Sequence, residues 1–189
     1  MSEMKKHKLM DVLGINLFLK KFNSTIDKVE LPPHDYTKYD LLVRAEELKY
    51  IEIKCNSDIT NPYVDHYITK SDWEWLIQET PTGSKALYIL FDDNSTIVYD
   101  LKAIHNLNLY YEGEKLNYTN QMDKLNAKME TFVFLNYPTN FKNKTVKMYL
   151  QGSKKLLGLS VKDLNLKIAQ GTLTQQDVDE VYRKINENF

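Results

Sequence analysis

Hydrophobic and polar residues alternate over residues 39–55, and this pattern is the clearest structural signal in the chain. Residues 39–45 (YDLLVRA) and residues 49–55 (KYIEIKC) each follow a period of two, and Glu46 and Glu47 interrupt the pattern between them. Such alternation predicts β-strands. The sequence therefore predicts two antiparallel strands joined by a short turn near Glu46.

This hairpin would bring three charged side chains to one face. With the turn centred near Glu46, Asp40 is the cross-strand partner of Glu52, and directly opposed residues share a face. Lys54 is two residues beyond Glu52 and points the same way. The other face would carry an apolar set suited to the core: Leu41, Val43, Ala45, Ile51, Ile53 and Cys55.

Two opposed carboxylates repel each other, so a hairpin selected for stability alone would not place Asp40 opposite Glu52. A divalent cation removes this conflict, because Mg²⁺ binds both carboxylate and phosphate oxygens. Lys54 could then hold a phosphate oxygen or the attacking water. The alternative interpretation is a solvated hairpin face on which charges happen to cluster. We favour a metal site.

Asp40, eleven intervening residues and then Glu52-Ile53-Lys54 resemble the D-x(n)-E-x-K core of the PD-(D/E)xK nuclease superfamily. That superfamily includes type II restriction enzymes and Holliday-junction resolvases, and its core runs helix, strand with Asp, strand with ExK, helix, strand. The resemblance implies an α/β fold with a restriction-endonuclease-like core, in which helices flank a central mixed β-sheet. It also implies that Asp40, Glu52 and the Ile53 carbonyl hold Mg²⁺ or Mn²⁺, while Lys54 orients or activates water.

The predicted elements follow the superfamily's order over residues 8–101. Residues 8–22 carry a helical apolar stripe interrupted by Gly14. Residues 71–74 (SDWE) form a capping box that opens a helix. Residues 86–91 and 95–101 are apolar segments that predict strands. We expect one nuclease domain, with its core at about 8–101.

The second half of the chain, about 102–189, is expected to be an extension with a helical tail. Met122, Leu125 and Met129 recur at helical spacing within a polar segment, and residues 131–135 predict a strand. Helices are expected at 160–170 and 174–186, and each begins with a capping signature. We expect this C-terminal helical hairpin to dock on the core through its apolar stripes.

Several other residues are candidates for the site. Where the superfamily often has proline before the first Asp, this chain has Tyr39. Asp35 follows two prolines and is the rival first carboxylate, but it lies too far from Glu52 for a tight hairpin to pair them. The resemblance also suggests His34 as an extra metal ligand, with a surface histidine as the alternative. It further suggests an additional acid in or after the first helix, either Asp11 or Asp27 and Glu30, and a substrate contact from Gln78 or Lys70 beside the helix after the hairpin.

Positive charge is concentrated late in the chain, although the net charge is −1. Residues 142–155 contain lysines and no acid, and with Lys70 they are the candidates for phosphate binding: Lys142, Lys144, Lys147, Lys154 and Lys155. The alternative is a solvated lysine-rich loop or strand. Arginine is scarce, so the commonest specific contact to guanine is largely unavailable and sequence specificity stays open.

Composition limits the remaining classes of function. A hydrophobic content of 42% and a charged content of 27% are typical of a globular chain with one core. No apolar segment approaches the roughly 18 residues that span a bilayer, so no membrane partner is expected. A lone cysteine, Cys55, cannot form an internal disulfide, which favours a cytoplasmic or other intracellular setting.

The sequence therefore predicts a metal-dependent endonuclease that hydrolyses DNA. A homodimer is expected if both strands are cut symmetrically. Two alternatives stay open at this point. One is an RNA endonuclease of the same fold, and the other is a non-catalytic module that keeps the nuclease fold and binds nucleic acid or protein.

Overall fold

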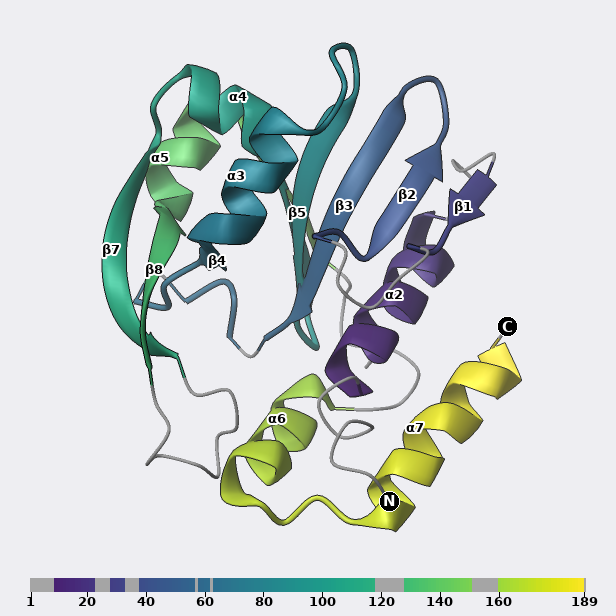
Figure 1. Cartoon of the computed structure of the whole chain (residues 1–189). Helices are drawn as coiled ribbons and strands as arrows, with labels where there is room; N and C mark the ends of the chain where they lie inside the picture. Colours follow the sequence, from purple (N-terminus) through teal and green to yellow (C-terminus); the bar gives the residue numbers. More distant parts are fainter. Residues whose placement is uncertain are drawn as a thin grey trace.

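Two β-sheets with helices packed on them make up the structure, a computed structural model (Figure 1). It describes residues 9–22, 28–32, 38–56, 58–61, 63–117, 128–150 and 160–188. The helices are α2 (Leu9–Phe22), α3 (Lys70–Gln78), α4 (Leu101–Asn106), α5 (Tyr137–Lys142), α6 (Val161–Gln170) and α7 (Gln175–Asn188). The strands are β1 (Lys28–Glu30), β2 (Leu41–Arg44), β3 (Leu48–Cys55), β4 (Tyr67–Thr69), β5 (Lys85–Phe91), β6 (Ser95–Asp100), β7 (Tyr110–Asn117), β8 (Lys128–Leu135) and β9 (Val146–Leu150).

The central sheet has six strands in the order β1-β2-β3-β5-β6-β9. Strands β3 and β5 are parallel, and every other neighbouring pair is antiparallel. Parallel neighbours need a crossover connection, which is supplied here by the segment containing α3. A second, three-stranded sheet has the order β4-β8-β7. The fold is therefore α/β with a mixed central sheet flanked by helices, as the sequence predicts.

The two faces of the central sheet pack against different layers. Ile51, Ile53 and Ile89 point to one face, where they join a core with α2, α6 and α7. Tyr88 and Leu90 point to the other face, where α3, α4 and the second sheet cover them. In Figure 1, α3 and α4 lie between the two sheets, whereas α2 and α7 lie on the far side of β3. Side-chain alternation along β3 and β5 sets this division.

Gly14 explains how α2 lies so close to β3. A Cβ atom at this position would come 2.8 Å from Ile53 Cγ2 and 3.1 Å from Cys55 Sγ. A larger residue would push the helix away from the strand. The glycine that interrupts the apolar stripe in the sequence is thus a close-packing position, and it holds the first turn of α2, which contains Asp11, near the end of β3.

The C-terminal helical hairpin docks on the core as predicted. Val161, Leu164, Val178 and Val181 are buried in the same cluster as α2 and β3. Both predicted caps form, since Ser160 and Thr174 accept from the N–H groups of the residues three positions later. Asp93, in the β5–β6 turn, accepts from the Val161 N–H at 2.6 Å and fastens the start of α6 to the central sheet.

Some local predictions are wrong. Helix α3 begins at Lys70 with Thr69 as its N-cap, so the capping box starts two residues before Ser71. Met129 was expected at helical spacing with Met122 and Leu125, yet it lies in β8 and pairs with Leu116 across the β7–β8 ladder. Residues 118–127, which include Met122 and Leu125, lie outside the described residues. Among the described residues, no helix has the length and apolarity needed to span a membrane.

Candidate active site

The β2–β3 hairpin has the predicted register. Its pairs run from Leu41 with Ile51 to Arg44 with Leu48, which centres the turn on Glu46. Asp40 lies directly before β2, and its N–H donates to the Ile51 carbonyl at 2.8 Å. Extending the register by one residue sets Asp40 opposite Glu52.

Asp40, Glu52 and Lys54 meet as the pattern predicts. Asp40 and Glu52 are close enough for each carboxyl group to influence the pKa of the other. Lys54 Nζ lies 3.0 Å from Glu52 Oε1 and 3.7 Å from Asp11 Oδ1. Helix α2 therefore contributes Asp11 to the same group, and two strands and one helix position four charged side chains.

The backbone of Ile53 also faces this group. Its N–H donates to Asp40 Oδ2 at 2.7 Å. In an extended strand, the N–H and C=O of one residue point to the same side. The Ile53 carbonyl therefore points to the side of β3 on which Asp40 lies, beyond the start of β2.

Two acids of this group, Glu52 and Asp40, have raised pKa values. Glu52 is only 7% exposed, and burial raises its pKa to about 8 although the charge of Lys54 acts in the opposite direction. Burial likewise raises the pKa of Asp40 against the charge of Lys54. Burial disfavours the Lys54 ammonium, but Glu52, Asp11 and Asp40 together raise the pKa of Lys54. Neighbouring carboxyl groups whose pKa values are raised by burial are common at functional sites.

The donor set suits a hard divalent cation. Two carboxyl groups and a carbonyl offer oxygen ligands only, which favour Mg²⁺ or Mn²⁺ over zinc. Among the described residues, no group of three or more His, Cys, Asp and Glu side chains is arranged to hold a metal. Mg²⁺ does not need such a group, because it commonly binds through one or two carboxylates and keeps several waters. Asp40, Glu52 and the Ile53 carbonyl could hold such an ion.

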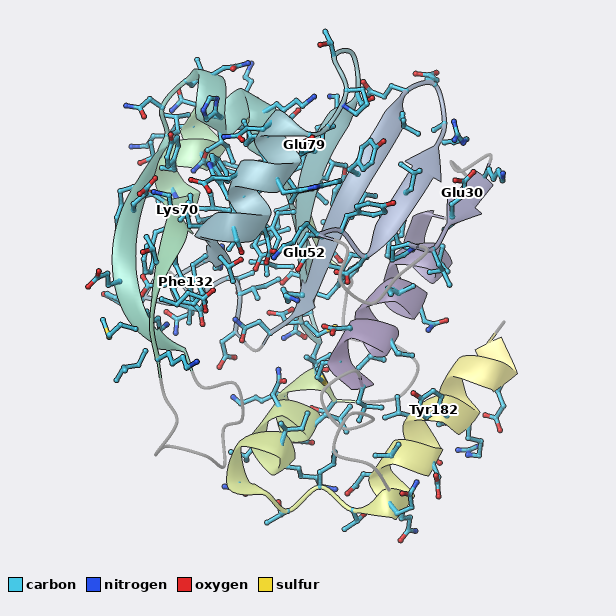
Figure 2. All side chains as sticks on the ribbon, viewed as in Figure 1. Glu30, Glu52, Lys70, Glu79, Phe132 and Tyr182 are labelled. Carbon is cyan, nitrogen blue, oxygen red and sulfur yellow. The ribbon has the colours of Figure 1, made fainter. Side chains whose placement is uncertain are left out.

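Glu52 and Lys54 lie on the floor of a cleft of about 790 Å³ between the central sheet, the second sheet and α6. We call this space the cleft. In Figure 2, Glu52 lies between the two sheets and Phe132 lies on the β8 side of the same space. Tyr88, the ladder partner of Glu52, also lies on the floor. Residues of the walls that matter below are Tyr67, Lys115, Phe132 and Lys162.

Two other candidates lie outside this group. Lys70 pairs with Glu112 at 2.7 Å on the outer side of α3 and does not line the cleft. Gln78 is exposed at the C-terminal end of α3, whereas Asp72 in the first turn lines the cleft. Five further candidates lie outside the described residues: Asp27, His34, Asp35, Lys154 and Lys155.

The described lysines of the 142–155 segment do not line the cleft. Lys147 pairs with Val98, which pairs with Ile89, so Lys147 lies on the sheet face opposite to Glu52. Lys144 and Lys147 line a separate groove of about 520 Å³ on that face, which we call the lysine groove. Lys142 is exposed at the end of α5.

The sequence did not single out the cationic and aromatic wall residues of the cleft. Lys115 and Tyr67 belong to the second sheet, and Lys162 belongs to α6. No local spacing connects these residues with Glu52, because only the packing of distant segments brings them together. Residues 110–117 (YYEGEKLN) do not alternate between apolar and polar positions, so no local pattern marked β7 in advance.

Comparison with known proteins identifies one family but no individual relative. No curated protein matches the chain, and no solved structure matches it. One family model matches residues 6–179, which include the hairpin, the cleft and most of the C-terminal helices. The chain therefore belongs to DUF6613, a family of unknown function.

Proposed function

We propose that this protein is a metal-dependent nuclease that hydrolyses phosphodiester bonds in DNA. The observation that carries the proposal is the position of Asp40 directly opposite Glu52, with Lys54 Nζ 3.0 Å from Glu52, at the cleft that Glu52 and Lys54 line. Burying two neighbouring carboxyl groups lowers the stability of the fold. Arrangements with such a cost are concentrated at functional sites.

The order of elements supports a restriction-endonuclease-like core. Helix α2 is followed by β1, by β2 with Asp40 directly before it, by β3 with Glu52 and Lys54, by β4, by α3, and by β5. Apart from the two three-residue strands β1 and β4, this is the order helix, Asp strand, ExK strand, helix, strand that the motif led us to expect. The parallel pairing of β3 with β5 sets Tyr88 beside Glu52 and completes the floor of the cleft.

Asp40, Glu52 and the Ile53 carbonyl would hold Mg²⁺ or Mn²⁺. When bound, such an ion polarises a phosphate oxygen and makes a bound water more acidic. Lys54 is 47% exposed at its side chain and can donate to a phosphate oxygen or to the attacking water. Asp11, at 3.7 Å, restrains the Lys54 ammonium on this side of β3. The recessed position of Glu52 limits the access of bulk water.

A cleavage assay with matched variants tests the proposal. The purified protein would be incubated with Mg²⁺ or Mn²⁺ and labelled duplex DNA, single-stranded DNA, four-way junctions and RNA. We expect metal-dependent cleavage of DNA that falls to background in Glu52→Ala. Glu47→Ala is the control, because Glu47 lies in the turn of the same hairpin and pairs with Lys85 outside the cleft. Equal cleavage by Glu52→Ala and the wild type would refute the assignment.

A further inference from the structure

We propose that the cleft takes an unpaired polynucleotide strand and not an intact duplex. The inference rests on the proposed function, since it concerns the substrate that reaches Glu52. It depends on the recessed position of Glu52 and on two observations that the hydrolytic proposal does not use, the aromatic wall and the placement of two lysines.

The size of the cleft favours one strand. Glu52 is almost fully buried on the floor of a space of about 790 Å³. Sites of about 300–1,000 Å³ enclose molecules of roughly drug size, and one or two nucleotides of a single strand are of that size. Proteins read a duplex by inserting a helix or ribbon into its grooves. Here the scissile phosphate has to enter the protein instead, between the second sheet and α6.

One wall of the cleft offers an aromatic surface for a base. Tyr67 is partly exposed there, and its ring meets the edge of Phe132 at a centroid distance of 5.0 Å. The Tyr88 hydroxyl donates to the Tyr67 carbonyl at 2.9 Å. Because Tyr88 is the ladder partner of Glu52, this bond ties the aromatic wall to the strand that carries the acids. An unpaired base can stack on such a ring, whereas a paired base inside a duplex cannot.

Two lysines stand on opposite walls, where they can contact the phosphates on either side of the scissile bond. Lys115 Nζ lies 4.1 Å from the centre of the Tyr67 ring. Lys162, in the first turn of α6, has an exposed ion pair with Asp58 at 3.6 Å. Exposed pairs of this kind are weak, so Lys162 can exchange Asp58 for a phosphate. Cations beside an aromatic ring are the usual composition of single-strand sites.

Binding in EDTA tests the inference without cleavage. Fluorescence anisotropy would compare a labelled single strand of DNA, an RNA strand of the same sequence and the DNA duplex. We expect the wild type to bind a single strand more tightly than the duplex. Tyr67→Ala should weaken strand binding by roughly 5- to 100-fold, the range for losing one stacked base. Tyr67→Phe keeps the ring and should bind like the wild type.

Lysine variants provide an independent arm, which remains informative if Tyr67→Ala does not fold. Lys115 is exposed on β7, and Lys115→Ala should reduce the salt dependence of strand binding by about 0.7 in the slope of log K against log salt. Lys147→Ala is the matched control, because Lys147 lies in the lysine groove on the opposite face. It should leave both the affinity and the slope unchanged.

Each outcome distinguishes the two proposals. Equal binding of duplex and strand, or strand binding that neither Tyr67→Ala nor Lys115→Ala alters, would overturn the single-strand inference. Glu52-dependent cleavage confined to duplex DNA would also overturn it, while leaving the nuclease proposal intact. Strand binding that depends on Tyr67, without cleavage of any substrate, would support the strand site and refute the nuclease. The DNA and RNA arms identify which kind of strand is preferred.

Discussion

Glu52 and Asp177 each pair with one lysine, yet their pKa values move in opposite directions. Glu52 lies on the floor of the cleft, where burial raises its pKa to about 8 although Lys54 is 3.0 Å away. Asp177 lies in the first turn of α7, where hydrogen bonds from Lys167 and Thr174 lower its pKa to about 2. Pairing with a lysine favours ionisation at both positions, but in the cleft the effect of burial outweighs it.

The difference distinguishes an acid that stabilises the fold from acids that destabilise it. Asp177 completes a capping box and accepts from both the N–H and the hydroxyl of Thr174, at 2.8 and 2.7 Å. Glu52 is instead buried against a second acid, Asp40. Some groups lower the stability of the fold and give no structural benefit. Such groups are typical of sites selected for their chemistry. The predictions that follow test this contrast.

The largest expected effect is on catalysis, and it should separate the two lysines. Lys54→Ala should lower kcat by about 100- to 1,000-fold, the cost of losing one preorganised donor to the transition state. Lys167→Ala should leave kcat unchanged, because Lys167 pairs with Asp177 and does not line the cleft. Single-turnover cleavage in Mn²⁺ measures both. Equal losses in the two variants would remove the distinction between the regions.

Neutralising the two acids should change stability in opposite directions. Without metal at pH 7, Glu52→Gln should raise the free energy of unfolding by about 1 kcal/mol, because it removes an ionisable group that folding forces to keep its proton. Asp177→Asn should lower that free energy by about 0.5 to 1 kcal/mol through its weaker cap and lost helix-dipole interaction. Urea unfolding followed by circular dichroism measures both. A loss of stability in both variants would show that Glu52 serves the fold.

The smallest expected effects concern pH, and their signs differ as well. The pKa of Asp177 falls on folding from 3.8 to about 2, so its contribution is present above pH 4 and is lost as pH falls towards 2. The pKa of Glu52 rises from 4.5 to about 8, so stability decreases as pH rises through that interval. The difference between wild type and Asp177→Asn should vanish near pH 2, and the gain from Glu52→Gln should vanish below pH 4. Thermal melts of the wild type and of both variants across this pH range measure these differences. A difference that persists where it is expected to vanish would contradict the prediction.

The sequence alone predicted the features that depend on residues close together in the chain. The β2–β3 register follows from alternation on both sides of Glu46, and the caps at Ser160 and Thr174 follow from residues three positions apart. These features depend on near neighbours, which a single sequence displays directly. The same locality placed Asp40, Glu52 and Lys54 on one face.

The sequence was insufficient where distant segments meet. Strands β1 and β4 have three residues each, too few to show a period, and they form because longer strands offer them edges. The walls of the cleft depend on how β7 and α6 pack, so Lys115 and Lys162 could not be linked to Glu52 in advance. The density of lysines pointed instead to residues 142–155. Of these, Lys144 and Lys147 line the lysine groove on the opposite face of the central sheet.

Calorimetric titration with Mn²⁺ is the most direct test of the central claim, that Asp40 and Glu52 form a metal site. The wild type should show one site per chain. Asp40→Ala and Glu52→Ala should each abolish it, and Asp177→Asn, which removes an acid of equal charge from the helical hairpin, should retain it. Binding of the same affinity in Glu52→Ala, or no binding in the wild type, would contradict the account.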